Sequence, residues 1–322
     1  MKAIYCTVMS RPFVPRALAL QDSIARHSPD AKFAFYCIDG ETAALLNTFE
    51  LKNAQVFAPN EFETPALRAV KTSLNPGEYC WTCKSVALLH AFATDPLLDW
   101  AVWVDSDMFA FADPNQALEA YAGASVVLTL HRFSWPEIAA YEPIVGRFNA
   151  GYVAVRNSKE GHAALTWWMR RCLESCSDEP TSENYADQKY LEQMPELFPN
   201  VVGSSHVGLN CAPWNVIGQN VAGGSEGVLV SNSPLLLYHF QGLKVVRYWA
   251  FDLYTSKMAL PDIVRQEVYR PYVTALVTQM RKVAARAEDP QLGIDGHFAG
   301  LRGFYLAVKQ FVWSRNMVLH FS

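Results

Sequence analysis

The chain has 322 residues, of which 51% are hydrophobic, 13% aromatic and 18% charged. This length and apolar content are ample for a large core, and they predict one large α/β domain or one domain with an appendage. The 27 Lys and Arg residues against 31 Asp and Glu residues give a net charge of −4, which argues against a nucleic-acid-binding surface. The charge is uneven: from Val246 onward, 10 basic and 6 acidic residues give +4, so the remainder carries −8.

Strand-like and helix-like stretches alternate along the chain. Strands are expected at 3–9, 32–39, near 55–57, and at 100–104, 125–130 and 148–155, with several short ones between 201 and 230. The stretch 234–244 is expected to be a strand that runs into a loop with His239, Gly242 and Lys244. Helices are expected around 17–25, from Thr42, at 81–92, from Asp113-Pro114, after Ser158, and at 184–194, 261–286 and 297–312. A strand, a helix and a second strand at this spacing predict a parallel βαβ unit.

The stretch from Trp100 to Asp107 is the most informative. Its apolar run, rich in aromatic and β-branched residues, is typical of a strand buried on both faces. The strand ends at Asp105 and Asp107, whose side chains point to the same face because they are two residues apart. Two carboxylates this close repel each other unless a cation or a shared proton relieves them, and carboxylate oxygens favour Mg²⁺ or Mn²⁺. The alternative is an ordinary turn at a strand end, where Asp and Ser are frequent.

The seven cysteines are odd in number and scattered in apolar stretches, which is typical of a reducing compartment. The pairs Cys80/Cys83 and Cys172/Cys176 have the spacing of zinc ligands, and ordinary core cysteines are the alternative. The N-terminus enters a strand directly rather than a signal peptide, and no uncharged apolar run is long enough to span a bilayer. These features predict a cytoplasmic protein, either free or peripheral at the inner face of the membrane.

Five short motifs follow one another in a fixed order. They are Trp103-Val-Asp-Ser-Asp107, Phe148-Asn-Ala-Gly151, Asp187-Gln188, Leu209-Asn-Cys-Ala-Pro-Trp-Asn215 and His239-Phe-Gln-Gly-Leu-Lys244. From Ala3 to about Lys244 the chain thereby resembles the metal-dependent glycosyltransferases of the GT-A fold, closest in layout to glycosyltransferase family 8 and related bacterial polysaccharide glycosyltransferases. The resemblance implies a Rossmann-like α/β fold with a mixed, mostly parallel sheet flanked by helices. It places a nucleotide-sugar-binding catalytic domain at 1–245 and a helical C-terminal extension at 246–322.

The same resemblance implies a role for individual residues. Asp105, Asp107 and His239 would bind Mn²⁺ or Mg²⁺ together with the donor's diphosphate. The phosphates would also be held by Lys84 and Lys244, the sugar pocket would be lined by Asn149, Asp187 and Gln188, and the nucleoside would meet Thr7 and Asp39. The alternatives are a structural histidine, solvated lysines and a helix-surface aspartate.

The donor implied by the resemblance is a nucleotide-sugar with UDP as the nucleotide, and the acceptor is a glycan, a lipopolysaccharide or a lipid-linked sugar. Transfer would retain the anomeric configuration, with Gln188 or Asp187 beside the oxocarbenium-like ring. Two departures from the family's pattern matter: the first leaves the base open, and the second concerns the phosphate loop. The acidic residue that often follows the first strand is missing from Val8-Met-Ser-Arg-Pro12, and Val245-Val246 replaces the Pro-Trp that commonly follows the lysine.

Two other functions and a membrane contact are also considered. A phosphatase of the haloacid dehalogenase type uses Asp-x-Asp with a nucleophilic carboxylate, but usually in the first strand, and here Met108 follows the motif deep in the chain. A non-catalytic nucleotide-sugar-binding module is the other alternative. The helix expected at 297–312 has an apolar stripe flanked by Arg302, Lys309 and Arg315, which would either lie on an anionic membrane or pack on the catalytic domain.

Overall fold

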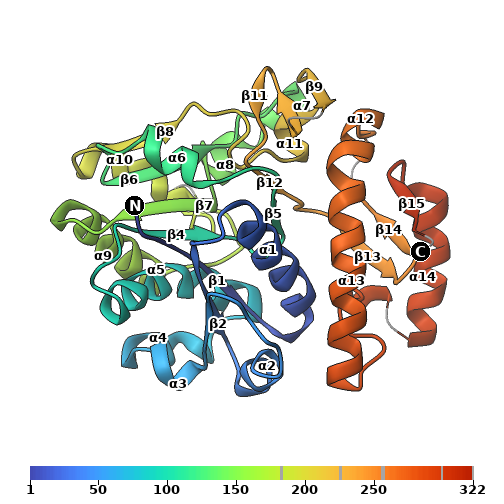
Figure 1. Cartoon of the computed structure of the whole chain (residues 1–322), viewed down its shortest axis with the longest axis horizontal. Coiled ribbons are helices and arrows are strands. Elements are labelled where there is room, and N and C mark those ends of the chain that lie inside the picture. Colours follow the sequence, from blue (N-terminus) through green and yellow to red (C-terminus); the bar gives the residue numbers. More distant parts are fainter. Residues whose placement is uncertain (182–183, 225–226, 255–257, 299, 321–322) are drawn as a thin grey trace.

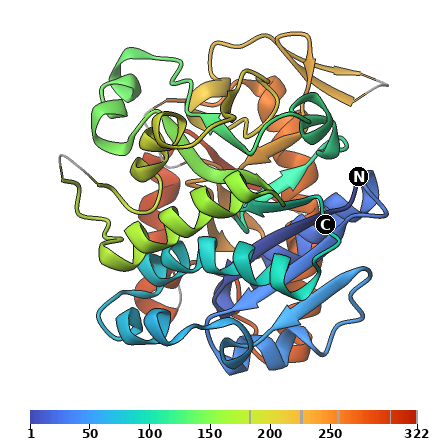
Figure 2. The same ribbon diagram turned by 90° about the vertical axis from the view of Figure 1, so that its left-hand side faces the viewer.

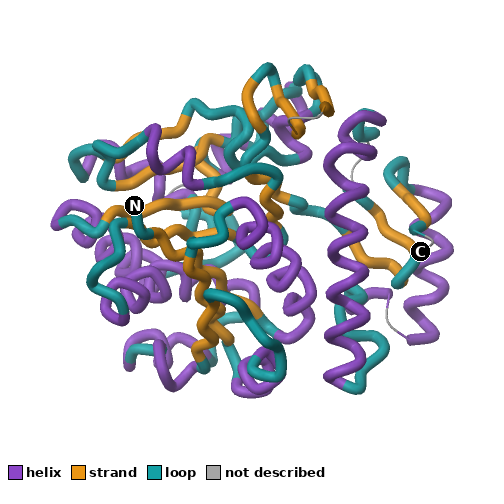
Figure 3. The backbone as a smooth tube through the Cα atoms, in the orientation of Figure 1, coloured by secondary structure: helices purple, strands orange, loops and turns teal. Residues whose placement is uncertain are grey.

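A mixed sheet of seven strands forms the centre of the protein (Figure 3). The computed structural model describes residues 1–320 apart from 182–183, 225–226, 255–257 and 299. The strands of the sheet are β1 (Ala3–Met9), β2 (Lys32–Cys37), β3 (Ala54–Phe57), β4 (Trp100–Val104), β6 (Val126–Leu130), β7 (Phe148–Arg156) and β8 (Val201–Ser204). Their order is β3-β2-β1-β4-β7-β6-β8, and β7 runs antiparallel to both of its neighbours while the other pairs are parallel. The expected mixed, mostly parallel sheet is confirmed.

Helices cover both faces of this sheet. Before residue 244 they are α1 (Val14–His27), α2 (Gly40–Leu46), α3 (Pro59–Phe62), α4 (Pro65–Lys71), α5 (Pro76–Thr94), α6 (Asn115–Ala120), α7 (Pro136–Ala139), α8 (Glu142–Val145), α9 (Lys159–Glu174), α10 (Met194–Leu197) and α11 (Pro213–Val216), with short 3₁₀ turns at Arg11–Phe13 and Lys189–Gln193. Figure 2 shows α5 and α9 side by side in front of the sheet. Ile4 and Cys6 of β1 pack toward α5, whereas Tyr5 packs toward α1, as the two-residue period of a strand requires.

Two local features position the site. The side chain of Asn75 accepts hydrogen bonds from the backbone N–H groups of Gly77 and Glu78, and the Glu78 carboxylate accepts one from the N–H of Asn75. This capping box fixes the start of α5, which carries Lys84. The short strand β5 (Met108–Ala110) pairs antiparallel with β12 (Leu237–His239), with His239 opposite Met108. His239 therefore lies beside the turn between β4 and β5, although more than 130 residues separate the two segments.

The last part of the chain forms a layer of its own beside α1. It contains α12 (Asp262–Val264), a π-helical segment (Arg265–Tyr269), α13 (Arg270–Ala287), a 3₁₀ turn (Gly296–Phe298) and α14 (Gly300–Trp313). It also contains an antiparallel sheet of β13 (Lys244–Arg247), β14 (Ala250–Asp252) and β15 (Met317–Leu319), which the sequence pattern did not predict. In Figure 1, α13 (orange) stands against α1 (blue), and the small sheet lies between α13 and α14 (red). None of the described helices is both long and apolar enough to cross a bilayer.

A second, smaller sheet lies at the edge of the domain, at the top of Figure 1. A three-stranded antiparallel sheet consists of β9 (Val221–Gly224), β10 (Gly227–Val230) and β11 (Ser233–Pro234). The short strands expected between 201 and 230 are thus confirmed.

One expectation differs from the structure, and one open alternative is decided by it. The helix expected at 184–194 is not continuous: residues 184–188 are not helical, and Ala186 has a left-handed φ of +50°, which interrupts a helix. The four cysteines with the spacing of zinc ligands are free and mostly buried, as the alternative of ordinary core cysteines expects. Among the described residues, the group able to hold a metal ion contains Asp105, Asp107 and His239 instead.

Candidate active site

Asp105, Asp107 and His239 converge at the ends of β4 and β12. One ligand atom from each side chain lies within 4.8 Å of the other two. His239 Nε2 is 3.1 Å from Asp107 Oδ1 and 3.8 Å from Asp105 Oδ2. The structure thus brings together the two carboxylates and the imidazole named from the sequence.

The charges of this cluster influence one another. Burial lowers the pKa of His239, but the carboxylates of Asp107 and Asp105 outweigh burial and leave that pKa above its ordinary value. Burial raises the pKa of Asp107, but His239 outweighs it, so the pKa of Asp107 falls below its ordinary value. The protonated form of His239 and the ionised form of Asp107 therefore favour each other.

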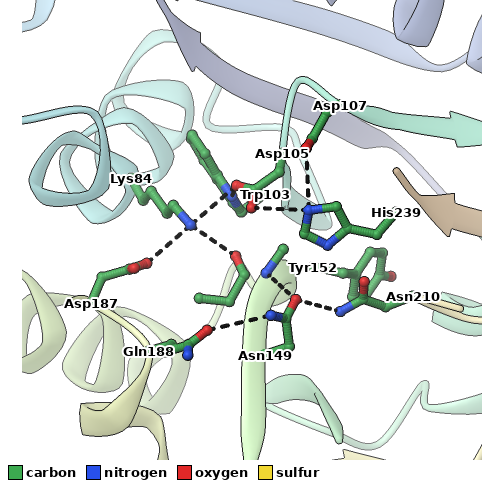
Figure 4. Close-up of polar contacts among 12 residues, drawn as sticks. Lys84, Trp103, Asp105, Asp107, Asn149, Tyr152, Asp187, Gln188, Asn210 and His239 are labelled. Carbon is green, nitrogen blue, oxygen red and sulfur yellow. Dashed lines mark hydrogen bonds and ion pairs between the residues drawn. The ribbon is translucent and has the colours of Figure 1, made fainter. Parts of the chain in front are cut away.

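Lys84 lies on the side of Asp105 that faces away from His239 (Figure 4). Its side chain is almost completely buried. Its Nζ is 3.1 Å from each of three oxygens: Asp105 Oδ1, Asp187 Oδ2 and the carbonyl of Ala150. Burial lowers the pKa of Lys84, yet the two carboxylates raise it above its ordinary value, so the ammonium stays charged. Burial raises the pKa of Asp187 to about 6 even though Lys84 acts against this. Lys84 thus holds two carboxylates from distant parts of the chain.

A network of amides continues the site along β7. Asn149 Oδ1 accepts hydrogen bonds from the N–H of Gly151 and from Asn210 Nδ2, each 2.9 Å long. Asn149 Nδ2 lies 3.3 Å from Gln188 Oε1 and 3.3 Å from His131 Nε2. Burial lowers the pKa of His131 to about 4, so this ring is neutral and its Nε2 is able to accept. The network fixes the orientation of the Asn149 side chain between those of Asn210 and Gln188.

Gly151 makes room for this arrangement. A Cβ atom at this position would lie 2.6 Å from His239 Nδ1 and 2.7 Å from Asn149 Oδ1. The carbonyl of Gly151 accepts a 2.9 Å hydrogen bond from the N–H of Asp105. The glycine in the Phe148–Gly151 motif therefore lets β7 approach the histidine and the carboxylates closely.

These side chains line a cavity of about 1160 Å³. Of the residues predicted for the site, the cavity wall contains Lys84, Asp105, Asp107, Asn149, Asp187, Gln188 and His239. Within the described chain, the other three lie away from this wall. Thr7 is buried in β1, directly before lining residues Val8–Ser10, and Asp39 caps α2 by accepting from the N–H of Thr42, while Lys244 begins β13.

Sequence reasoning missed several residues that help to form the site. Trp103 Nε1 donates a 2.7 Å hydrogen bond to Asp105 Oδ1, a contact that the motif Trp103–Asp107 did not indicate. His131 lines the cavity directly after β6, and a polar residue at a strand end was a usable signal. Asn210 lies inside a motif that was noted, with a left-handed φ of +53°. Such a conformation is not readable from one sequence.

Comparison with solved structures defines the class of fold. No family model matches the chain. The galactosyltransferase LgtC, solved in complex with donor and acceptor sugar analogs, superimposes with a TM-score of 0.51 at 14% identity, over 86% of this chain and 95% of LgtC. The protein shares the GT-A-like fold of this glycosyltransferase.

Two relatives from Bacillus subtilis strain 168 are closer in sequence. The uncharacterized protein YfnF is 32% identical over 253 residues, which is 76% of this chain and 83% of YfnF. The uncharacterized protein YfnD is 30% identical over 287 residues, which is 88% of this chain and 92% of YfnD. The chain belongs to the family that contains YfnF and YfnD.

Proposed function

We propose that the protein is a glycosyltransferase that moves a sugar from a nucleotide-diphosphate donor, a UDP-sugar, to a glycan or lipid-linked acceptor. The observation that carries this proposal is the convergence of Asp105, Asp107 and His239 in the wall of one large cavity. The cavity lies at the ends of inner strands of an α/β sheet, where such sheets bind ligands. The GT-A-like fold supports the same class of reaction.

The three ligand side chains fit a hard divalent cation. Two carboxylates and an imidazole whose ligand atoms lie within 4.8 Å of one another suit Mn²⁺ or Mg²⁺ shared with a substrate diphosphate. Such an ion, when bound, supplies Lewis-acid stabilisation of the charge that develops on the departing diphosphate. Trp103 and Lys84 hold Asp105 Oδ1 from two directions and so orient the other oxygen of that carboxylate toward His239.

We assign the sugar end of the donor to the side of Lys84 where Asp187 lies, away from Asp105. Positive charge develops on the sugar ring as its bond to the diphosphate breaks, and a nearby carboxylate or carbonyl stabilises that charge. Asp187 and the side-chain oxygen of Gln188 lie on this side, and Asn149 orients Gln188. With a pKa of about 6, Asp187 is anionic at neutral pH.

We assign the nucleoside end of the donor to the part of the cavity wall formed by Val8–Ser10, next to Thr7.

We divide the chain into a nucleotide-sugar-binding domain at 1–245 and an extension at 246–322. Transfer retains the anomeric configuration, and a product with inverted linkage by NMR would refute this part alone.

Turnover with a panel of nucleotide-sugars and Mn²⁺ tests the proposal. We expect slow release of the nucleotide diphosphate from a UDP-sugar, abolished by EDTA. Release of inorganic phosphate from a phosphomonoester would instead support a phosphatase. Tight nucleotide binding without turnover by any donor would support a non-catalytic module.

The acceptor is proposed to lie at an anionic membrane surface. On α14 the side chains of Tyr305, Val312 and Trp313 are 71–78% exposed, and Lys309 and Arg315 are exposed nearby. Residues 300–322 contain no Asp or Glu. The side chain of Arg302, also assigned here from the sequence, lies outside the described part. Flotation with anionic vesicles should weaken when Val312 and Trp313 are both changed to Ser, and equal flotation of both proteins would exclude this contact.

A further inference from the structure

Arg16 is a buried arginine outside the cavity wall. It lies in α1, and only 6% of its surface is exposed. Its Nη2 is 3.3 Å from Asp295 Oδ2, in the C-terminal extension, and 3.4 Å from the carbonyl oxygen of Leu243. Arginine is almost never fully buried unless it is paired, and Asp295 provides the counter-charge here. The ion pair joins residues 279 positions apart in the chain.

The segment that Arg16 contacts is the loop between β12 and β13, residues 240–243, which directly follows His239. The loop begins next to a proposed metal ligand, because the N–H of Phe240 donates a 2.9 Å hydrogen bond to the carbonyl of Asp107. It ends at β13, where the N–H of Val245 donates to Asp295 Oδ2 over 2.5 Å. One carboxylate oxygen of Asp295 thus receives both Arg16 and the backbone just beyond the loop.

The middle of the loop faces the cavity. Gln241 and Gly242 line it together with Asp105, Asp107 and His239. Gly242 has a left-handed φ of +84°, and a Cβ there would lie 3.0 Å from the ring of Tyr254. Tyr254, which belongs to the extension, also lines the cavity. The extension therefore contacts the loop at Gly242, and through Asp295 it contacts Val245 just beyond the loop.

Arg16 also supports a second part of the cavity wall. Its guanidinium lies 5.0 Å from the centre of the Phe13 ring, and Phe13 lines the cavity at the start of α1. The helix that carries Arg16 packs against α13 of the extension. Arg16 therefore joins three segments: the start of α1, the loop after His239 and the extension.

We propose that Arg16 and Asp295 are positioning residues that hold the loop at 240–243 in the shape needed to bind the donor's diphosphate. The C-terminal extension is then a structural component of the donor site rather than an independent appendage. This inference rests on the proposed function, because the diphosphate is the ligand that the loop would meet.

Steady-state kinetics of the full-length Arg16→Gln variant test the proposal. We expect KM for the UDP-sugar that the wild type uses to rise about tenfold, with kcat changed less than about threefold. Asp295→Asn should behave alike, because it keeps an oxygen for the N–H of Val245 but loses the charge that faces Arg16. Arg16→Lys should recover part of the loss, since it keeps the charge.

Arg265→Gln is the matched control. Arg265 Nη2 donates to the carbonyl of Arg315 and to Asn316 Oδ1, so it also joins two segments of the extension, but neither of them is the loop. This variant should keep the wild-type KM even if its Tm falls as far as that of Arg16→Gln. Equal KM changes in both variants, or a wild-type KM in Arg16→Gln and Asp295→Asn, would overturn the proposal.

Amide hydrogen exchange separates this inference from the proposed function. In the absence of ligand, peptides covering 237–247 should exchange faster in Arg16→Gln than in the wild type, and at the wild-type rate in Arg265→Gln. Unchanged exchange in Arg16→Gln refutes the proposal that Arg16 holds the loop at 240–243, whatever the activity of the variant is. Failure of the wild type to turn over any nucleotide-sugar refutes the proposed function and leaves the exchange result to decide whether Arg16 holds the loop.

Discussion

Carboxylates lie on both sides of Lys84, but they differ in exposure and in the groups with which they are paired. On one side, the side chains of Asp105 and Asp107 are 26% and 23% exposed and face His239. On the other side, Asp187 is 3% exposed and is paired with the buried ammonium of Lys84. A carboxylate that water reaches is able to exchange its partner for a cation, whereas a carboxylate buried with its counter-charge is fixed in place. The comparison separates an open, ion-binding side from a closed, orienting side.

The largest effect should come from removing the charge that the two sides share. Lys84→Met leaves Asp187 buried without a counter-charge, so we expect the free energy of unfolding to fall by about 3–5 kcal/mol in urea denaturation. Lys189→Met is a matched control, because this buried ammonium donates to the carbonyls of Pro143 and Thr181. Its loss leaves no buried charge unpaired and should cost less, about 1.5–3 kcal/mol. Equal losses in the two variants would mean that the closed side does not depend on its ion pair.

Asp107→Asn tests the open side alone. We expect the rate at which nucleotide diphosphate is released from the donor to fall about 10²–10³-fold. The divalent cation that would stabilise the developing charge loses one of its three protein ligands in this variant. The exposed Asp30, in the turn before β2, provides the control Asp30→Asn, which should leave the rate unchanged. Wild-type activity in Asp107→Asn would remove this carboxylate from the metal site.

Gly151→Ala probes the close packing between the two sides. The added Cβ must displace His239 or Asn149, so we expect Mn²⁺ affinity, measured by calorimetry, to fall roughly 10–100-fold. Gly123→Ala, where a Cβ meets no atom within 4 Å, should bind Mn²⁺ as the wild type does. An unchanged affinity in Gly151→Ala would show that His239 does not need its present position.

The smallest effect concerns pH and His131. Burial lowers the pKa of His131 to about 4 from an ordinary 6.5, so below pH 6.5 the unfolded chain takes up a proton that the folded chain does not. Stability contributed by neutral His131 is therefore lost as the pH falls from about 6.5 toward 4. Between pH 6 and pH 5, the wild type should lose roughly 1 kcal/mol more unfolding free energy than His131→Gln does. Identical pH dependence in the two proteins would contradict the burial of a neutral ring.

Much of the fold was predictable because its signals are local. The apolar run at Trp100–Val104 forms β4, and the strand expected at 3–9 forms β1, with the helices around them as expected. Asp105 and Asp107 were visible because they follow a buried strand. His239 was placed near them by resemblance, and the pairing of β12 with β5 shows how the chain brings it there.

What escaped prediction depends on contacts between distant segments. Arg16 looks like an ordinary helix-surface residue until Asp295, far along the chain, is folded against it. Lys84 is predicted to hold a phosphate, and its contacts with oxygens of Asp105, Asp187 and Ala150 join segments too far apart in the chain for any local pattern to indicate them. The sheet of the extension combines Met317–Leu319 with strands more than 60 residues earlier, a pairing that no local pattern specifies.

The most direct test of the account is a crystal structure of the protein with Mn²⁺ and UDP, with the metal located by anomalous scattering. The account predicts one manganese peak bound by Asp105, Asp107 and His239 and in contact with the diphosphate. A peak bound elsewhere, or UDP seated with no metal among these three side chains, would contradict it.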